Sequence, residues 1–227
     1  MIAVKCISKT HTNTFKALNN ISLTVDQGEF VFLVGPSGAG KSTLLNCLFC
    51  KERITNGEIN VLNYPVHNLT PDQIPYLRRQ IGVIFQDYKL LPKRTVYENI
   101  AFALQVLHVT RSQVHQMVHQ VLELVNLTSK AHHYPTELSG GEQQRVCIAR
   151  AIVHNPPILL ADEPTGNLDP DTAWDIMQLL TKVNHRKKTV IIATHDRDIV
   201  NKMRKRVIKI ENGAITHDQA IGQYHAV

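Results

Sequence analysis

Residues 35–42 have the composition and spacing of a phosphate-binding loop. The run Gly-Pro-Ser-Gly-Ala-Gly-Lys-Ser follows a short apolar stretch and precedes a helical pattern. Glycines let backbone N–H groups approach phosphate oxygens because no Cβ stands in the way, and the positive end of the following helix points at the same anion. In this pattern the Lys41 amine reaches the β- and γ-phosphates and the Ser42 hydroxyl can ligate Mg²⁺. The predicted nucleotide-binding residues are Gly35, Pro36, Ser37, Gly38, Ala39, Gly40, Lys41, Ser42 and Thr43.

Two carboxylates, Asp162 and Glu163, directly follow a second apolar run at 157–161. A buried strand that ends there would place Asp162 at the edge of the sheet, where its carboxylate can hold Mg²⁺ through a water molecule. Glu163, the next residue, can polarise a water for attack on the γ-phosphate. Acidic pairs after strands are common, so this prediction depends on the phosphate-binding loop upstream.

Residues 138–144, Leu-Ser-Gly-Gly-Glu-Gln-Gln, begin a predicted helix that runs to about residue 154. Ser139 and Glu142 have the spacing of a capping box. A capped helix start needs neither of the two glycines between them, but glycines there expose backbone donors to an anion. This run resembles the signature motif of the ATP-binding-cassette (ABC) ATPases.

The resemblance implies Mg²⁺-dependent ATP hydrolysis by a homodimer. In that family two subunits pair head to tail, and the signature of one contacts the ATP held by the other. The signature residues that would act in trans are Ser139, Gly140, Gly141 and Glu142.

The other ABC motifs follow in order across nearly the whole chain. Gln86 resembles the glutamine that touches Mg²⁺ and the water and links to the membrane partner. Asp169, at the end of Gly-Asn-Leu-Asp, resembles the D-loop aspartate at the dimer interface. His195, after the apolar run 189–194, resembles the histidine that contacts the γ-phosphate. Thus Glu163, His195 and Gln86 are the predicted catalytic residues, and the predicted Mg²⁺ site combines Ser42, Gln86 and, through water, Asp162.

The adenine contact departs from the family pattern. An aromatic residue, often Tyr, usually stacks on adenine just before the second strand, and here His11 stands at that position with Phe15 nearby. Imidazole stacks but offers less apolar area than phenol. Either residue, or neither, fills the role.

Residues 86–100 and 161–170 resemble the cell-division branch of the ABC family. That resemblance implies an ATPase bound, as a peripheral protein at the cytoplasmic face of the cell membrane, to an integral membrane partner that regulates cell-wall hydrolases. The alternative is the ATPase of a lipoprotein-release or macrolide-type exporter, because those proteins share much of 161–170.

Two further alternatives belong to other functional classes. Lys187, Lys188 and the basic run 202–206 could contact nucleic acid, but such runs are more often solvated faces, and no nucleic acid partner is expected. A regulator that binds nucleotide without turnover is disfavoured because all the hydrolytic residues are present.

The elements that must position these residues follow from composition and periodicity. The 227 residues are 43% hydrophobic and carry a net charge of +6, which excludes a disordered chain. Mixed or alternating patterns predict strands at 2–8 and 18–25, and apolar runs predict buried strands at 29–34, 157–161 and 189–194. Helical spacing is found at 95–107, 114–127 and 171–183. A capping box from Thr110 to Gln113 precedes the second of these ranges, and Asp169 is the N-cap of the third.

This order predicts an α/β fold, a P-loop NTPase of ABC type with a mainly parallel core sheet, an antiparallel N-terminal β-subdomain and an all-helical insert. Residues 1–227 would form one ABC ATPase domain, with about 1–87 and 146–227 as the RecA-like core and β-subdomain and about 88–145 as the helical subdomain. The longest apolar-rich stretch, 100–109, is too short to cross a membrane.

Two residue pairs at metal-ligand spacing have simpler interpretations. Cys47 and Cys50 form a C-x-x-C inside a helical apolar pattern, which favours buried thiols over a zinc or redox site. His115 and His119 lie one helical turn apart, which favours a solvated helix face because the zinc-peptidase pattern needs Glu where Gln116 stands.

Overall fold

A six-stranded sheet forms the centre of the fold in this computed structural model, which describes residues 1–11, 15–107, 109–222 and 224. Its strand order is β10-β9-β3-β8-β7-β6. All neighbouring strands are parallel except the antiparallel pair β9 and β10. The strands are β3 (Phe30–Val34), β6 (Ile81–Ile84), β7 (Ile158–Asp162), β8 (Thr189–Ala193), β9 (Arg206–Glu211) and β10 (Ala214–Gln219).

A second, antiparallel sheet of four strands packs beside the first in the order β2-β1-β4-β5. Its strands are β1 (Ile2–Thr10), β2 (Lys16–Val25), β4 (Asn56–Val61) and β5 (Tyr64–Pro65). Together the two sheets confirm the predicted fold class, with its mainly parallel core sheet and antiparallel N-terminal β-subdomain.

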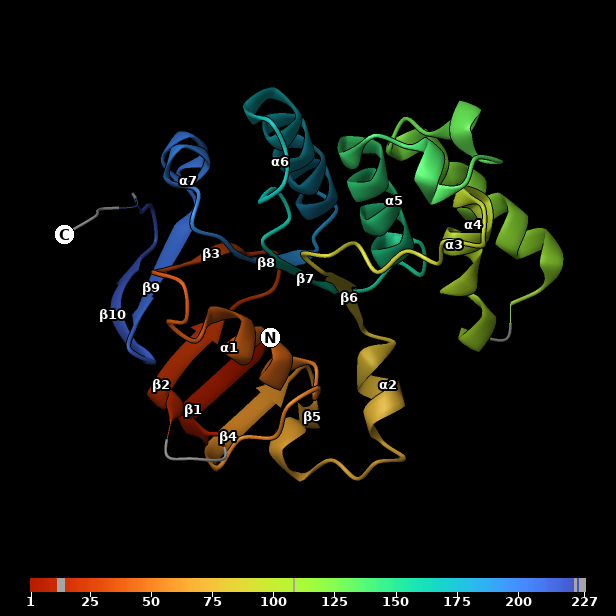
Figure 1. The fold of residues 1–227 in the computed structure, drawn as a ribbon. Coiled ribbons are helices and arrows are strands. Elements are labelled where there is room, and N and C mark those ends of the chain that lie inside the picture. The colour runs from red at the N-terminus through yellow and green to blue at the C-terminus, as the bar shows by residue number, and fades with distance from the viewer. Residues whose placement is uncertain (12–14, 108, 223, 225–227) are drawn as a thin grey trace.

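The helices divide between the two faces of the six-stranded sheet (Figure 1). Helices α6 and α7 lie above the sheet, whereas α1 lies below it, next to the four-stranded sheet, and α3, α4 and α5 lie beyond β6. The α-helices are α1 (Lys41–Leu48), α2 (Ile74–Arg78), α3 (Val96–Phe102), α4 (Arg111–Leu124), α5 (Gly140–Ile152), α6 (Pro170–Asn184) and α7 (Arg197–Met203). Short 3₁₀-helices are η1 (Val66–Asn68), η2 (Gln105–Leu107), η3 (Thr128–Lys130) and η4 (Pro135–Glu137).

The central strands are buried on both faces, which explains their continuous apolar sequence. Along β3, Phe30, Phe32 and Val34 face a core shared with α3 to α7, whereas Val31 and Leu33 face a core shared with α1 and the four-stranded sheet. The sheet therefore holds the carboxyl ends of β3, β7 and β8 at one edge, where the loops that carry the predicted chemistry begin.

The predicted helix 95–107 is too long. Helix α3 ends at Phe102 and a 3₁₀-turn follows at Gln105–Leu107. The amides of Ala103 and Leu104 bond to carbonyls three residues back, so the chain tightens there.

The predicted helix 114–127 is also displaced: it starts at Arg111, directly after the Thr110 cap, and ends at Leu124. Asn126, with φ 56°, adopts the left-handed conformation that ends helices. From 96 to 152, apart from residue 108, the structure contains helices and no strand.

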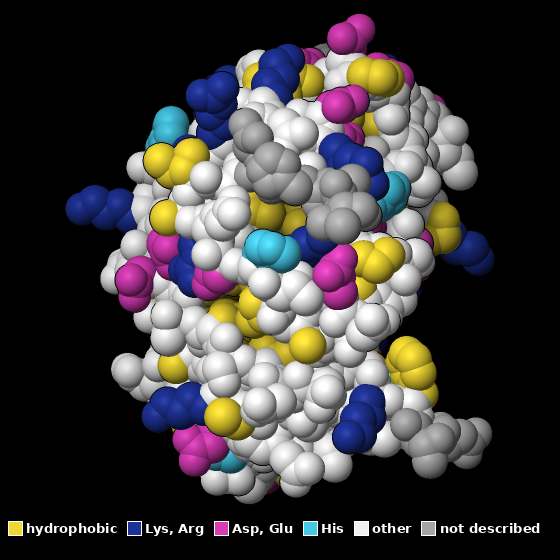
Figure 2. All heavy atoms as spheres, turned by 90° about the vertical axis from the view of Figure 1, so that its left-hand side faces the viewer, with side chains coloured by type: hydrophobic (Ala, Val, Ile, Leu, Met, Phe, Trp, Pro, Cys, Tyr) yellow, Lys and Arg dark blue, Asp and Glu magenta, His cyan; other side chains and the backbone are white. Residues whose placement is uncertain are grey.

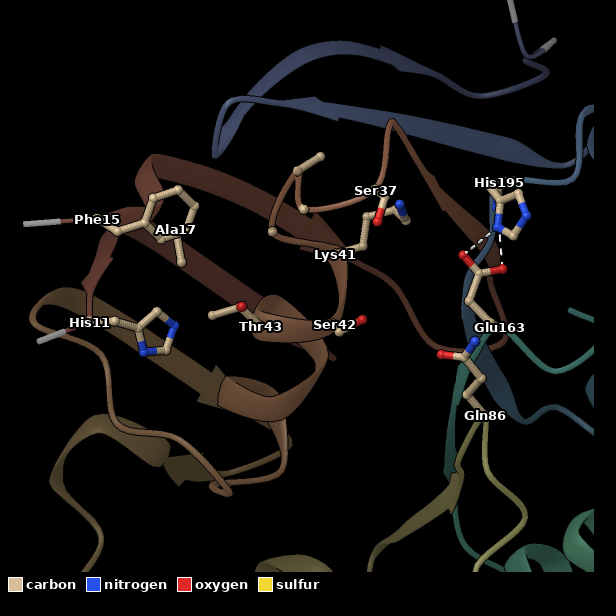
Figure 3. Close-up of a pocket in the computed structure, with 13 residues that line it drawn as sticks. His11, Phe15, Ala17, Ser37, Lys41, Ser42, Thr43, Gln86, Glu163 and His195 are labelled. Atoms are coloured by element: carbon tan, nitrogen blue, oxygen red, sulfur yellow. Dashed lines mark hydrogen bonds and ion pairs between the residues drawn. The ribbon is translucent and has the colours of Figure 1, made fainter. Parts of the chain in front are cut away.

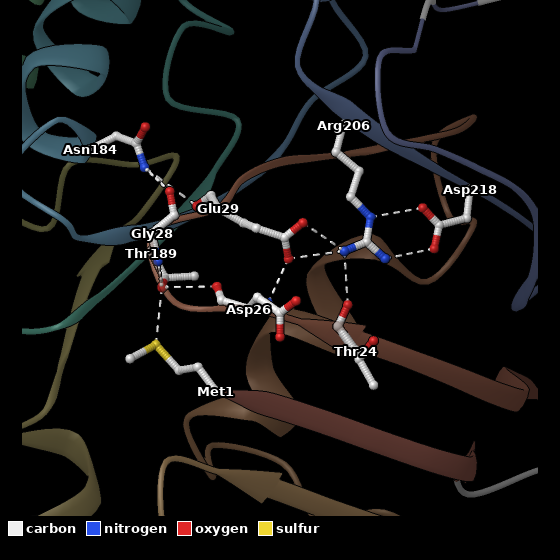
Figure 4. A network of polar contacts seen from close by, with 9 residues as sticks. All are labelled: Met1, Thr24, Asp26, Gly28, Glu29, Asn184, Thr189, Arg206 and Asp218. Carbon is white, nitrogen blue, oxygen red and sulfur yellow. Dashed lines mark hydrogen bonds and ion pairs between the residues drawn. The ribbon is translucent and has the colours of Figure 1, made fainter.

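Polar side chains tie β9, β10 and the loop before β3 together (Figure 4). The Arg206 guanidinium donates to Asp218 at 2.7 Å, to Glu29 at 3.0 Å and to the Thr24 carbonyl at 2.9 Å. The hydrogen bonds to Asp218 are the largest cause of a raised Arg206 pKa. One residue of the basic run considered for nucleic acid is therefore engaged in a structural network.

Charges of both signs are distributed over the surface. On the face in Figure 2, Lys and Arg side chains are interspersed with Asp and Glu and do not form one basic field. Among the described residues, no helix is both long and apolar enough to span a membrane.

The two pairs at metal-ligand spacing occupy different environments. Cys47 and Cys50 are buried, and burial raises the pKa of the Cys47 thiol to about 12, which keeps it protonated. His115 and His119 are both exposed on α4, with ring centroids 4.6 Å apart. These positions agree with a core role for the thiols and a solvated helix face for the histidines.

Candidate functional site

The loop between β3 and α1 contains glycines at positions where a residue with a Cβ would not fit. Gly35 and Gly40 have φ of 147° and 106°, a region that strains residues with a Cβ. A Cβ at Gly35 would collide with the carbonyl oxygen of Ile210, and one at Gly40 would collide with the carbonyl oxygen of Ala17. The loop therefore packs closely against β9 and β2. At Gly38, by contrast, a Cβ would meet no atom within 4 Å, so this side of the loop is open toward the cavity.

Lys41, the first residue of α1, is buried at 7% exposure. Its amine donates to the carbonyl oxygens of Gly35 at 2.7 Å and Pro36 at 3.0 Å, so it folds back over the loop. Burial lowers the Lys41 pKa, and the nearby charges of Glu163 and Asp162 oppose that shift. The amine is therefore a cation held inside the loop by neutral carbonyl acceptors. Charged phosphate oxygens would be stronger acceptors for it.

Ser42 and Asp162 meet at the base of the loop. The Ser42 hydroxyl donates to Asp162 Oδ1 at 2.9 Å. Burial is the largest cause of a raised Asp162 pKa, and the hydrogen bond from Ser42 partly offsets it. A hydroxyl and a carboxylate oxygen side by side are the hard donors that Mg²⁺ prefers.

Glu163 and His195 are in hydrogen-bonding contact at the ends of the neighbouring strands β7 and β8. His195 Nδ1 lies 2.8 Å from Glu163 Oε1, and the Glu163 amide donates to the Ala193 carbonyl at 2.9 Å. Glu163 has a left-handed φ of 47°, which is costly for a residue with a Cβ and is common at functional sites.

Lys41, Ser42, Glu163 and His195 line one cavity of about 450 Å³, whereas Asp162 does not line it. Figure 3 shows Lys41 and Ser42 between a wall formed by Gln86, Glu163 and His195 and an opposite end formed by His11, Phe15 and Ala17. The structure therefore brings together most of the residues predicted for nucleotide and Mg²⁺. The lining residues are His11, Phe15, Ala17, Ser37, Gly38, Ala39, Gly40, Lys41, Ser42, Thr43, Gln86, Glu163 and His195.

Both candidates for the adenine contact are at the open end of this cavity. Phe15 is 61% exposed, and His11 Nε2 lies 3.7 Å from Glu52 Oε2. Ala17, which no motif singles out, lies beside them on β2. Its backbone carbonyl lies close to Gly40, and that packing becomes visible only in the folded chain.

The signature residues lie elsewhere. Ser139 caps α5, where its hydroxyl accepts from the Glu142 amide at 3.2 Å while Glu142 accepts from the Ser139 amide at 2.8 Å. Asp169 likewise caps α6 by accepting from the Thr172 amide at 3.0 Å. Neither the signature nor Asp169 lines the cavity of its own chain.

Known proteins are similar to this chain in family, sequence and fold. Residues 18–166 match the ABC transporter family. The chain is 52% identical to the cell division ATP-binding protein FtsE of Bacillus subtilis over 99% of this chain and 98% of that protein. It is 48% identical to the protein of the same name from Mycobacterium tuberculosis, with 99% and 98% covered.

A solved structure has the same fold. The dimeric post-hydrolysis state of the ATP-binding cassette MJ0796, bound to ADP and Pi, matches with a TM-score of 0.89 and 36% identity over 99% of this chain and 100% of that chain.

The fold and the site define a P-loop ATPase with an ABC signature helix. The chain belongs to the ABC transporter family, and the prediction that it is an ABC-type ATPase is confirmed. The relatives named FtsE confirm the resemblance to the cell-division branch.

Proposed function

We propose that the chain is the ATP-hydrolysing subunit of a cell-division ABC system, active as a homodimer on an FtsX-like integral membrane protein. One observation supports it above the others: Lys41, Ser42, Glu163 and His195 line one cavity, and Asp162 is hydrogen-bonded to Ser42. The names of the relatives supply the cell-division assignment. Residues 1–87 and 146–227 serve as core and β-subdomain, and 88–145 as the helical subdomain.

The loop binds the phosphates. Lys41 exchanges the carbonyls of Gly35 and Pro36 for β- and γ-phosphate oxygens, which are stronger acceptors because they are charged. The amides at the start of α1 point at the same anion, since that helix has no side-chain cap to occupy them. His11 and Phe15 flank the place left for adenine.

Ser42 and Gln86, which line the same cavity, would hold Mg²⁺ directly, and Asp162, which is hydrogen-bonded to Ser42, would hold it through water, because hydroxyl, amide and carboxylate oxygens are hard donors. Mg²⁺ bound there supplies a Lewis acid that neutralises charge on the phosphates. Ser42 and Asp162 exchange their mutual hydrogen bond for this role.

Glu163 positions and polarises the attacking water. Its carboxylate lines the cavity, with Oε1 2.8 Å from His195 Nδ1 and Oε2 accepting from the His195 amide at 3.4 Å, and a further lone pair of the carboxylate would accept from the water. His195 then lies at the γ-phosphate end of the cavity, where it supports charge that builds in the transition state.

A second copy completes the site. Ser139, Gly140, Gly141 and Glu142 line no part of their own chain's cavity, so they serve the partner's ATP, and Asp169 lies at the interface between the copies. The dimer reported for MJ0796 supports this arrangement. The membrane partner places the assembly at the cytoplasmic face of the membrane.

The test is purification of the chain co-expressed with an FtsX-like membrane protein that carries the affinity tag. We expect the chain to copurify from detergent-solubilised membranes and to hydrolyse ATP with Mg²⁺. The Lys41→Ala variant should copurify but bind a fluorescent ATP analogue at least about 10-fold more weakly, because it loses a charged phosphate contact.

Two outcomes contradict parts of the proposal. Unchanged nucleotide affinity in Lys41→Ala removes the loop from the mechanism. In the second outcome, the chain fails to copurify with the FtsX-like protein and is captured by a membrane protein that has a large periplasmic domain. That result would support the exporter alternative.

A further inference from the structure

Tyr88 and Lys89, just beyond Gln86, have a left-handed backbone. Their φ angles are 56° and 48°. This conformation is unfavourable for residues with a Cβ and persists where surrounding contacts fix it. Because Gln86 lines the cavity, the pair connects the cavity to the helices that begin at Val96.

Arg150 on α5 fixes this pair through its backbone. The guanidinium donates to the Lys89 carbonyl at 2.6 Å and to the Tyr88 carbonyl at 2.8 Å. Cys147, nearly one turn earlier, donates its thiol to the same Tyr88 carbonyl at 3.0 Å. Burial raises the pKa of that thiol to about 12, so it keeps the proton that it donates. A planar guanidinium matches two adjacent acceptors with a fixed geometry that an ammonium lacks.

The Tyr88 side chain extends to the opposite end of the same helix. A Cβ on Gly140 would lie 3.4 Å from the Tyr88 hydroxyl oxygen. Helix α5 therefore meets Tyr88 twice, at its backbone through Arg150 and Cys147 and at its hydroxyl beside Gly140. Any shift of the segment after Gln86 must carry the start of α5 with it or break these contacts.

We infer that Arg150 is a positioning residue for hydrolysis. It holds Tyr88 and Lys89 in their left-handed conformation, and through them it sets the orientation of Gln86 in the cavity and the position of Gly140 at the start of α5. Arg150 itself does not line the cavity. The inference rests on the proposed function, since it assigns Arg150 to the hydrolysis step of that site.

The experiment compares Arg150→Ala and Arg150→Lys with Asn184→Ala in the full chain. Asn184 is the matched control because its buried amide also bridges carbonyls away from the cavity, those of Gly28 at 2.8 Å, Lys188 at 2.7 Å and Glu29 at 3.4 Å. The measurements are kcat for ATP, Kd for a fluorescent ATP analogue, and Tm.

We expect kcat of Arg150→Ala to fall about 10-fold to 100-fold while the analogue Kd stays within about twofold, because misplacement affects the reaction more than phosphate binding. Arg150→Lys should recover part of kcat, and free guanidinium should restore part of the Arg150→Ala rate. Asn184→Ala should lower Tm without a matching loss of kcat.

An Arg150→Ala enzyme with wild-type kcat overturns the inference. So does a fall in kcat that Asn184→Ala shares, or one explained by a parallel loss of nucleotide affinity. An inactive wild-type chain contradicts the proposed function instead, so the two failures are distinguishable.

Discussion

Lys41 and Asp162 have pKa values shifted in opposite directions by the same cause. Burial lowers the pKa of the Lys41 amine and raises that of the Asp162 carboxyl, because desolvation penalises the charged form of each group. The site therefore holds charges at a cost to the stability of the chain, and bound nucleotide and Mg²⁺ would offset that cost. Substitutions that remove one charge should stabilise the fold and impair the site.

Asp162→Asn tests this cost. The folded pKa of Asp162 lies above the unfolded value of about 3.9, so its ionisation removes stability as pH rises through the folded pKa. Asn keeps an acceptor for Ser42 without the charge. We expect the Tm of the variant, without nucleotide, to exceed that of wild type by about 2 °C at pH 7. The difference should vanish as pH falls toward about 4.

Calorimetry across this pH range is the measurement, with ATP hydrolysis as the second readout. The variant should lose Mg²⁺-dependent turnover even though it is more stable. A lower Tm at pH 7 would show that the ionised carboxylate stabilises the fold.

At the scale of elements, sequence patterns predict the strands and helices that depend on residues close together in the chain. The apolar runs of β3, β7 and β8 are buried as expected, and the caps Thr110, Ser139 and Asp169 begin their helices. Each of these signals depends on burial of a strand or on hydrogen bonds that span three residues. Most of the cavity was predictable for the same reason, because its residues directly follow such strands.

Elements fixed by tertiary contacts could not be predicted. Strand β9 interrupts its apolar pattern with Lys209, and it is fixed by pairing with β3 from the first part of the chain. The left-handed Tyr88–Lys89 pair accepts hydrogen bonds from Arg150, some sixty residues later. Such contacts join distant parts of the chain and leave no periodic signal.

Gly82→Ala tests the packing of β6 against α5. A Cβ at Gly82 would collide with the carbonyl oxygen of Ala151, a backbone atom that cannot rotate away. We expect the free energy of unfolding to fall by about 1 to 3 kcal/mol, measured by urea denaturation. Gly166→Ala is the control, since its Cβ would meet neighbours at an ordinary 3.6 Å and should change stability by no more than about 0.5 kcal/mol. Equal stability of the two variants would contradict this packing.

At the scale of the whole molecule, the cavity and the signature of one chain do not meet. The loop, Glu163 and His195 line the cavity, whereas the signature at the start of α5 lies outside it. The proposed head-to-tail pair of copies would bring each signature to the other's cavity. ATP would then be the contact that joins the two copies.

Sedimentation of Glu163→Gln with and without ATP tests this claim most directly. The amide keeps the size of the side chain but cannot polarise the water, so bound ATP should persist and hold the copies together. We predict a monomer without nucleotide and a dimer with ATP and Mg²⁺, with no turnover. A chain that binds ATP yet remains monomeric at saturating concentration would contradict the composite site.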